Sequence, residues 1–317
     1  MSSNLPLLIA IPALFSQFLA VRSLFATNQR YPSDASEKKS VATRVDQTFG
    51  ISEKLQQLDC GDSLQGYRPV IVDDGSIVRH DFVVDRVSMG PSVFILRKFC
   101  TYEECERIQN SAKTSEMEVA QTFSGQDETV KRKECDVTWM NNSRLNGVIS
   151  SLAHAAGNIL LSDAVKFSPG AGCEDLQVLR YGKTGEYKLH HDSYDRVLTV
   201  LYYLNGSGET WFPFGSKSRN TDSSSRDIAT KPRNREEAME MAARLTPGEN
   251  GLLVSCDNVR IADDSDVFIS ATQGDAIAFF NYFIDESGKA QPDWSSLHAG
   301  LPTVRTKWIA NHWFHGG

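Results

Sequence analysis

Two segments in the first half of the chain carry apolar residues at helical spacing. Cys105, Ile108 and Ala112 follow one another at i, i+3 and i+7, and Thr101 occupies the N-cap position before them. A second apolar stripe with the same period runs through residues 145–161. The pattern therefore predicts two helices before the middle of the chain.

After Pro169-Gly170 the pattern changes to runs rich in β-branched and aromatic residues, separated by clusters of Gly, Asn, Asp and Ser. Many short strands with such separators are typical of a sandwich or a barrel. Shorter β-like runs precede the helices at residues 69–72 and 82–84, and we expect an α+β fold. The strands predicted in the second half cover residues 176–181, 196–204, 209–214, 267–270, 275–282 and 303–313.

The sequence before and between these elements suggests how the chain is divided into segments. Residues 1–21 carry no charged side chain, and their apolar core resembles the hydrophobic region of a signal peptide or a short membrane anchor. A buried N-terminal helix is the alternative. We expect a signal or anchor over residues 1–26, a stem or linker over 27–90 and one domain over 91–317. Residues 215–250, Ser-rich and charged, form an expected exposed insertion with one helical piece at 235–245.

Composition narrows the class of protein. Of 317 residues, 40% are hydrophobic and 23% are charged, which is typical of a globular chain. The net charge of −7 argues against nucleic acid as a partner. Six scattered cysteines form no C-x-x-C pair, and their even number permits three disulfides in an oxidising compartment. Together with the N-terminal segment, this favours the lumen of the endoplasmic reticulum or Golgi.

The segment Tyr187-Lys188-Leu189-His190-His191-Asp192 carries the clearest chemistry. On a strand, His190 and Asp192 project from one face and His191 from the other, because side chains alternate. His298, 108 residues after His190, is the best candidate for a third ligand. Two histidines and one carboxylate form the facial triad of non-haem Fe(II) oxygenases.

A 2-oxoglutarate co-substrate would need a cation for its distal carboxylate. Lys307 lies nine residues after His298 on the predicted last strand, and Arg305 lies two residues before Lys307 on the same face. Strand spacing alone does not choose between these two cations.

With these motifs in this order, the chain resembles the catalytic domain of the 2-oxoglutarate/Fe(II)-dependent prolyl 4-hydroxylases, over about residues 94–315. The matching segments are Phe99-Cys100-Thr101-Tyr102-Glu103-Glu104-Cys105, Leu176 to Tyr187, His190-His191-Asp192, Arg196 to Leu204, Gly208-Glu209-Thr210-Trp211-Phe212-Pro213, Gly274-Asp275-Ala276, Leu297-His298-Ala299-Gly300-Leu301-Pro302, Lys307-Trp308 and Trp313.

The resemblance implies a double-stranded β-helix (jelly-roll) core with an N-terminal helical buttress. It also implies a dioxygenase of the procollagen-proline 4-dioxygenase type, which hydroxylates prolyl residues of a Pro-rich polypeptide and releases succinate and CO2. Fe(II), 2-oxoglutarate and L-ascorbate are the implied cofactors. The implied site consists of His190, Asp192 and His298 for the metal, Lys307, Tyr181 and Thr210 for 2-oxoglutarate, and Tyr187, Arg196 and Trp313 for the substrate.

The chain departs from the family pattern at three places. Ser207 precedes Gly208 where the family has a second glycine, and the interval from His298 to Lys307 is one residue shorter than the common pattern. In addition, Arg132-Lys133-Glu134 poorly matches the Arg-Thr-Ser segment of relatives. Other readings of the same residues are a dioxygenase acting on another side chain or a small molecule, and a non-catalytic jelly-roll binding module. A zinc hydrolase is the weakest, because it leaves Lys307 unexplained and such sites use a nearby Glu base.

Overall fold

The computed structural model describes residues 47–316, except residues 73, 121–131, 164, 166–171, 193–194, 217–231, 245–258 and 262–265. The expected signal or anchor segment and most of the expected insertion lie outside these residues, as does Cys256. No helix in the described ranges is long and apolar enough to cross a membrane. The cysteines within those ranges carry free thiols.

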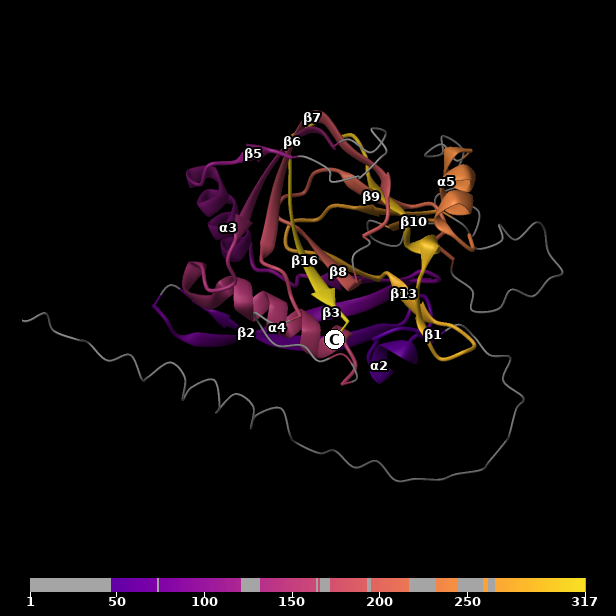
Figure 1. The fold of residues 1–317 in the computed structure, drawn as a ribbon. Helices are drawn as coiled ribbons and strands as arrows, with labels where there is room; N and C mark the ends of the chain where they lie inside the picture. Colours follow the sequence, from indigo (N-terminus) through magenta and orange to yellow (C-terminus); the bar gives the residue numbers. More distant parts are fainter. Residues whose placement is uncertain are drawn as a thin grey trace, which may run out of the picture. The chain divides into compact units, whose positions relative to one another are not determined.

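One large antiparallel sheet dominates the fold (Figure 1). Its hydrogen-bonded order is β10-β11-β9-β15-β7-β16-β8-β12-β4-β3-β2, with β6 paired to β7 and β5 to β6. The strands are β2 (Ser63–Ile71), β3 (Ile77–Met89), β4 (Ser92–Arg97), β5 (Glu118–Val119), β6 (Arg132–Met140), β7 (Leu176–His190), β8 (Arg196–Tyr203), β9 (Glu209–Phe212), β10 (Val259–Ile261), β11 (Val267–Ser270), β12 (Ala276–Phe280), β15 (His298–Gly300) and β16 (Lys307–His315).

A small sheet and short helices complete the described chain. The sheet contains β1 (Gln47–Thr48), β13 (Tyr282–Ile284) and β14 (Ala290–Pro292). The short helices are α2 (Glu53–Gln56), α5 (Arg235–Ala243) and the 3-10 turns η1 (Leu145–Gly147) and η2 (Trp294–Ser296).

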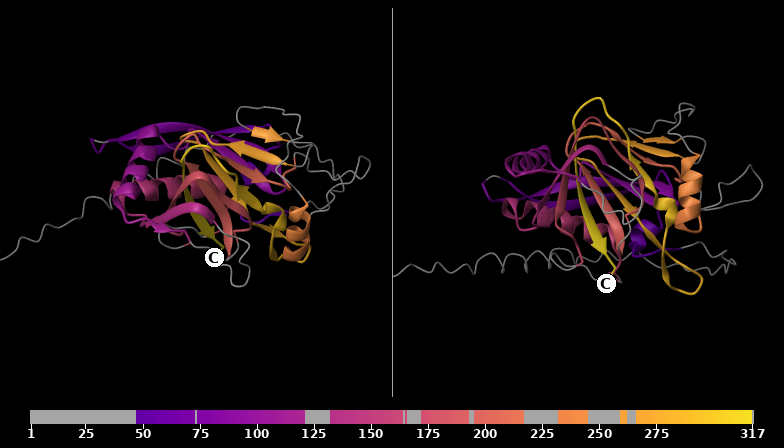
Figure 2. Two further views of the ribbon diagram at one scale, coloured as in Figure 1. Left: turned by 90° about the horizontal axis from the view of Figure 1, so that it is seen from above. Right: turned by 45° about the horizontal axis from the view of Figure 1, so that its top comes forward.

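The central strands of the large sheet are buried on both faces. In β4, Phe94 and Leu96 pack with helices α3 (Tyr102–Thr114) and α4 (Val148–Leu160), whereas Val93 and Ile95 belong to a second core. Figures 1 and 2 show α3 and α4 beside each other on one side of the sheet. The two helices therefore support the sheet from outside.

The sheet folds over on itself around the second core. Phe212 of β9 lies 5.2 Å, between ring centroids, from Phe279 of β12, although four other strands separate β9 from β12 in the sheet order. The β11-β9-β15 part therefore faces the β16-β8-β12 part with apolar side chains between them. This is the jelly-roll core expected from the resemblance, and the α+β prediction is confirmed.

Helix α3 begins as the sequence predicts. The Thr101 side chain accepts a hydrogen bond from the Glu104 backbone, and the Glu104 side chain accepts one from the Thr101 backbone. This capping box satisfies amide groups that a helix start leaves free. Glu104 also pairs with the buried Arg68 of β2, so the start of α3 is attached to the sheet.

The structure differs from the sequence-based expectations at several boundaries. Strands β2 and β3 belong to the large sheet, so residues 63–89 are part of the domain and not of a stem. Strand β6 was not expected, because its first residues are mostly charged. The strand expected over 275–282 is interrupted at Asn281, and the last strand begins only at Lys307.

Candidate active site

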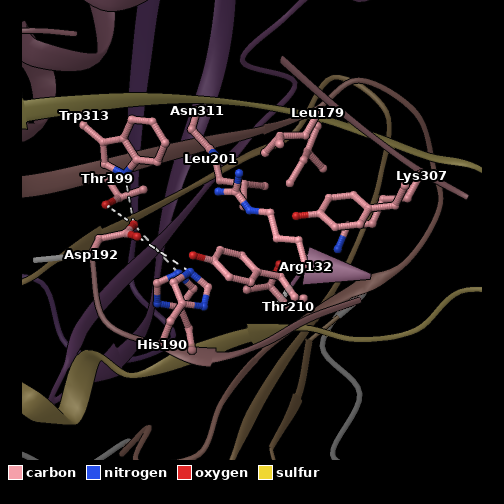
Figure 3. A pocket seen from close by; sticks show the side chains of 15 residues that line it. Arg132, Leu179, His190, Asp192, Thr199, Leu201, Thr210, Lys307, Asn311 and Trp313 are labelled. Carbon is pink, nitrogen blue, oxygen red and sulfur yellow. Dashed lines mark hydrogen bonds and ion pairs between the residues drawn. The ribbon is translucent and has the colours of Figure 1, made fainter. Parts of the chain in front are cut away.

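A pocket opens between the two facing parts of the large sheet. Alternate residues of β16 line it: Lys307, Ile309, Asn311 and Trp313. In Figure 3, Asp192 and Trp313 lie at one end and Lys307 at the other. A single strand face therefore extends from one end of the pocket to the other.

The three predicted metal ligands come together at the first end. His190, Asp192 and His298 offer ligand atoms that all lie within 4.8 Å of one another. His190 is the last residue of β7 and is paired in register with His298 of β15. Asp192 was expected on the same strand face as His190, but it follows the end of β7, so the loop and not the strand period turns its carboxylate toward the histidines.

Both imidazoles are oriented by the main chain. His190 donates its Nδ1–H to the Lys188 carbonyl at 2.8 Å, and His298 donates its Nδ1–H to the Ser296 carbonyl at 3.0 Å. Such bonds leave Nε2 free for a metal. Burial lowers the pKa of both histidines, further for His190 because of His298 beside it, so both are neutral near pH 7.

The Asp192 carboxylate is held by two side chains. Thr199 Oγ1 donates to Oδ2 at 2.8 Å and Trp313 Nε1 donates to it at 3.0 Å, while Oδ1 lies 3.7 Å from His190 Nε2. Burial by itself raises the pKa of Asp192, but His298, His190 and the two hydrogen bonds outweigh it and lower the pKa. An ionised carboxylate with two neutral imidazoles is a donor set that suits Fe(II).

His191 points away from this cluster, as predicted. Its Nε2 lies 3.2 Å from the Asp293 carbonyl, and its ring packs 4.8 Å from Trp294, between centroids. His191 therefore holds the middle of the His190-His191-Asp192 segment outside the pocket.

Lys307 forms the second end of the pocket. Its side chain is 2% exposed, and Nζ donates to the Glu209 carbonyl at 3.2 Å. Burial lowers the pKa of Lys307 to about 8. Arg305, which was expected on the same strand face, precedes β16 and is exposed. The structure therefore selects Lys307 as the cation inside the pocket.

Residues of β7 and β9 and the glycine before β9 pack closely around Lys307. Tyr181 of β7 is its register partner, and Nζ lies 5.7 Å from the Tyr181 ring. Thr210, buried on β9, shares a 2.8 Å hydrogen bond with the Tyr203 hydroxyl. Gly208 has a φ of +90°, and a Cβ there would lie 2.6 Å from Lys307 Cδ. A glycine at this position leaves room for the lysine stem.

Of the three predicted substrate residues, two line the pocket. Tyr187 stacks on His190 with 3.5 Å between ring centroids, and Trp313 borders Asp192. Arg196 does not line it: the guanidinium lies 3.9 Å from the Trp313 ring and forms two hydrogen bonds with Glu174. Arg196 therefore supports the indole from behind.

Several lining residues were not among the predicted site residues, and two of these, Arg132 and Asn311, are polar and carry an atom left unpaired within the described part of the chain. The Arg132 guanidinium lies 4.4 Å from the Tyr187 ring and donates to Gln177 Oε1 at 3.3 Å. Buried Arg132 Nε and Asn311 Oδ1 have no hydrogen-bond partner among the described residues. The two-residue period of β16 would have indicated Asn311, whereas Arg132 lies on a strand that the pattern did not reveal.

Comparisons with known proteins agree with this geometry. Residues 176–315 match the family model of the 2OG-Fe(II) oxygenase superfamily. Over 261 residues the chain is 26% identical to a probable prolyl 4-hydroxylase 4 of Arabidopsis thaliana, covering 77% of this chain and 74% of the plant protein.

A mouse (Mus musculus) transmembrane prolyl 4-hydroxylase is 32% identical over 185 residues, which cover 49% of this chain and 31% of the mouse protein. Among solved structures, a viral collagen prolyl hydroxylase from Paramecium Bursaria Chlorella virus-1 aligns with a TM-score of 0.41 and 17% identity, covering 71% of this chain and 96% of the viral one.

Proposed function

We propose that the chain, whose residues 176–315 match the 2OG-Fe(II) oxygenase superfamily, hydroxylates prolyl residues in a Pro-rich polypeptide. The enzyme class, an Fe(II)- and 2-oxoglutarate-dependent dioxygenase of the prolyl 4-hydroxylase type, is the one its named relatives share. The identity of the polypeptide substrate is the proposed part.

His190, Asp192 and His298 would hold the iron. Bound Fe(II) would supply the activation of O2 that allows 2-oxoglutarate to be decarboxylated and an unactivated C–H bond to be hydroxylated. The protein orients the ligands through backbone and side-chain hydrogen bonds before any metal arrives. Three protein ligands on one side leave positions for co-substrates.

Lys307 would hold the distal carboxylate of 2-oxoglutarate, with Tyr181 and Thr210 beside it. A buried ammonium with one main-chain partner retains donors for an incoming carboxylate. In this low-dielectric environment the ion pair is stronger than at the surface. The pocket between Lys307 and the Asp192 end thus orients the co-substrate toward the metal ligands.

The lining supports a peptide substrate with proline in it. Tyr187 and Trp313 present aromatic surface next to the metal ligands, which suits a pyrrolidine ring. Extended polyproline II segments bind aromatic-lined grooves at low entropic cost. Arg132 Nε offers a buried donor to a peptide carbonyl in the same pocket.

One observation carries the proposal. Two neutral histidines and an ionised aspartate lie together at one end of the pocket, and a buried lysine lies at the other end. The test is a succinate-release screen with Fe(II), 2-oxoglutarate and poly-proline, collagen-like or hydroxyproline-rich glycoprotein-like peptides. We expect one oxygen atom gained on proline by mass spectrometry. Oxygen on another residue, or succinate with no peptide dependence, would contradict the proposed substrate.

Ascorbate is the proposed reductant that returns oxidised iron to Fe(II). The proposal rests on the resemblance to prolyl 4-hydroxylases. In repeated-turnover assays, omission of ascorbate should leave the first turnovers intact and shorten the linear phase. Equal progress curves with and without ascorbate would exclude this role.

We also propose that residues 1–26 direct the chain to the endoplasmic reticulum or Golgi, as a cleaved signal or as an anchor. The uncharged apolar run supports this. A tagged full-length protein should be found in these compartments, and a protein lacking residues 1–26 should remain cytosolic. Cytosolic full-length protein would refute the proposal.

A further inference from the structure

Trp139 is unusual among the tryptophans of this chain. All five lie in the described ranges, and Trp139 alone has an exposed side chain, with 46% of its surface accessible. A large indole left in solvent is the kind of residue that binding surfaces use. Its position relative to the pocket indicates what it would bind.

The sheet register places Trp139 on the face that forms the pocket wall. Trp139 of β6 is paired with Gln177 of β7, which is paired with Asn311 of β16, which is paired with Leu201 of β8. Asn311 and Leu201 line the pocket. One row of paired residues therefore runs from inside the pocket outward to Trp139.

The rings continue the same surface. Trp139 lies 5.9 Å from Trp313 between ring centroids, with a tilt of 42°. Trp313 in turn donates to Asp192 Oδ2 at 3.0 Å. A stepped aromatic surface thus leads from the metal-ligand carboxylate through a buried indole to an exposed one.

A buried polar atom lies in the same row. Asn311 Oδ1 has no hydrogen-bond partner among the residues that the structure describes, although it is shielded from solvent. An acceptor in this state is costly unless a ligand supplies a donor. The row therefore combines apolar surface with one unused acceptor, which the N–H group of a non-prolyl residue in a bound peptide would satisfy.

We propose that Trp139 binds the residue one polyproline II turn away from the hydroxylated proline, and prefers proline there. This rests on the proposed function. A polyproline II helix advances about 9 Å in three residues and returns side chains to the same face. Trp313 borders Asp192, and Trp139 lies 5.9 Å beyond it between ring centroids, so Trp139 is one indole farther from the metal ligands than Trp313. The pyrrolidine ring three residues from the target would then pack on the exposed indole.

The experiment measures peptide binding and hydroxylation separately. Full-length protein, Trp139→Ala and Trp139→Phe are titrated with a poly-proline peptide by calorimetry, and hydroxylation is followed by mass spectrometry. We expect Trp139→Ala to weaken peptide binding about tenfold and Trp139→Phe to restore most of it. The Michaelis constant for 2-oxoglutarate should not change.

Two controls make the assignment specific. Tyr102→Ala removes another exposed aromatic ring, 64% accessible, at the start of α3, and should not affect peptide binding. In the wild type, replacing the prolines three residues from a single target proline by alanine should weaken binding as much as Trp139→Ala does, and the two changes should not add.

The outcomes distinguish the role of Trp139 from the proposed function. Unchanged binding by Trp139→Ala, with hydroxylation intact, overturns the role of Trp139 and leaves the proposed function standing. If Trp139→Ala binds poly-proline more weakly but the wild type does not hydroxylate proline, the Trp139 site is supported and the proposed function is overturned. Failure of the wild type to bind poly-proline overturns both.

Discussion

The two ends of the pocket are stabilised in different ways. At the metal end, hydrogen bonds orient all three side chains: the two histidines donate to backbone carbonyls, and Asp192 accepts from two side chains. The ligand atoms are therefore oriented before a metal binds. At the other end, Lys307 has one main-chain bond and is enclosed by close contacts, with Gly208 leaving space for its stem.

This difference follows from what each end would bind. A transition metal demands ligand geometry, and the hydrogen bonds that orient its ligands matter for affinity. A carboxylate ion pair tolerates small displacements but depends on the local dielectric. The metal end should therefore be sensitive to lost hydrogen bonds, and the lysine end to lost charge.

The largest effect is expected at the metal end. Asp192→Ala removes the carboxylate from the cluster and should reduce turnover by at least about a thousandfold, with loss of Fe(II) binding. His191→Ala, whose ring lies outside the cluster, should stay within about tenfold of wild type. Titration with Fe(II) under nitrogen, alongside succinate release, measures both. An inactive His191→Ala beside an active His190→Ala would show that the ligands are assigned wrongly.

The next effect separates the two ends. Lys307→Ala should raise the Michaelis constant for 2-oxoglutarate about 100-fold by removing a buried ion-pair partner, with Fe(II) binding little changed. Arg305→Ala is the matched control, because this exposed cation lies two residues earlier. If Arg305→Ala instead gives the 2-oxoglutarate defect, the assignment of Lys307 fails.

A smaller effect tests the hydrogen bonds at the metal end. Thr199→Val keeps the shape and removes the donor to Asp192 Oδ2, and it should weaken Fe(II) binding about tenfold. The Michaelis constant for 2-oxoglutarate, measured at saturating Fe(II), should remain near the wild-type value. Unaltered Fe(II) affinity would mean that Trp313 alone is sufficient to orient the carboxylate.

The smallest effect tests the charge at the lysine end. Lys307, with a pKa of about 8, is protonated below this value and loses its charge as the pH rises through it. Because a neutral amine cannot pair with a carboxylate, the Michaelis constant for 2-oxoglutarate should rise about fourfold between pH 7 and pH 8.5. The same profile should be flat for Lys307→Arg, whose guanidinium stays charged. An identical rise in that variant would assign the pH dependence to another group.

Much of the fold was predictable because it depends on local patterns. The start of α3 follows from Thr101 and Glu104 three residues apart, and the strands of the second half follow from dense β-branched and aromatic runs. Strand β6 was not predictable in this way. Its first residues are charged, and they are held in a strand by pairing with β7, a contact that no local sequence pattern shows.

For the site, the sequence by itself determined the residue types: two histidines, an aspartate and candidate cations at spacings that match a known family. Only the tertiary structure decided which groups meet. Asp192 faces the histidines from beyond the end of the strand, and Lys307 is buried whereas Arg305 is exposed. Arg196 lies behind Trp313, and Arg132 lines the pocket. The physical reason is that burial and dielectric are set by residues distant in the chain, so identical charges two positions apart acquire different chemistry only after the sheet has folded over.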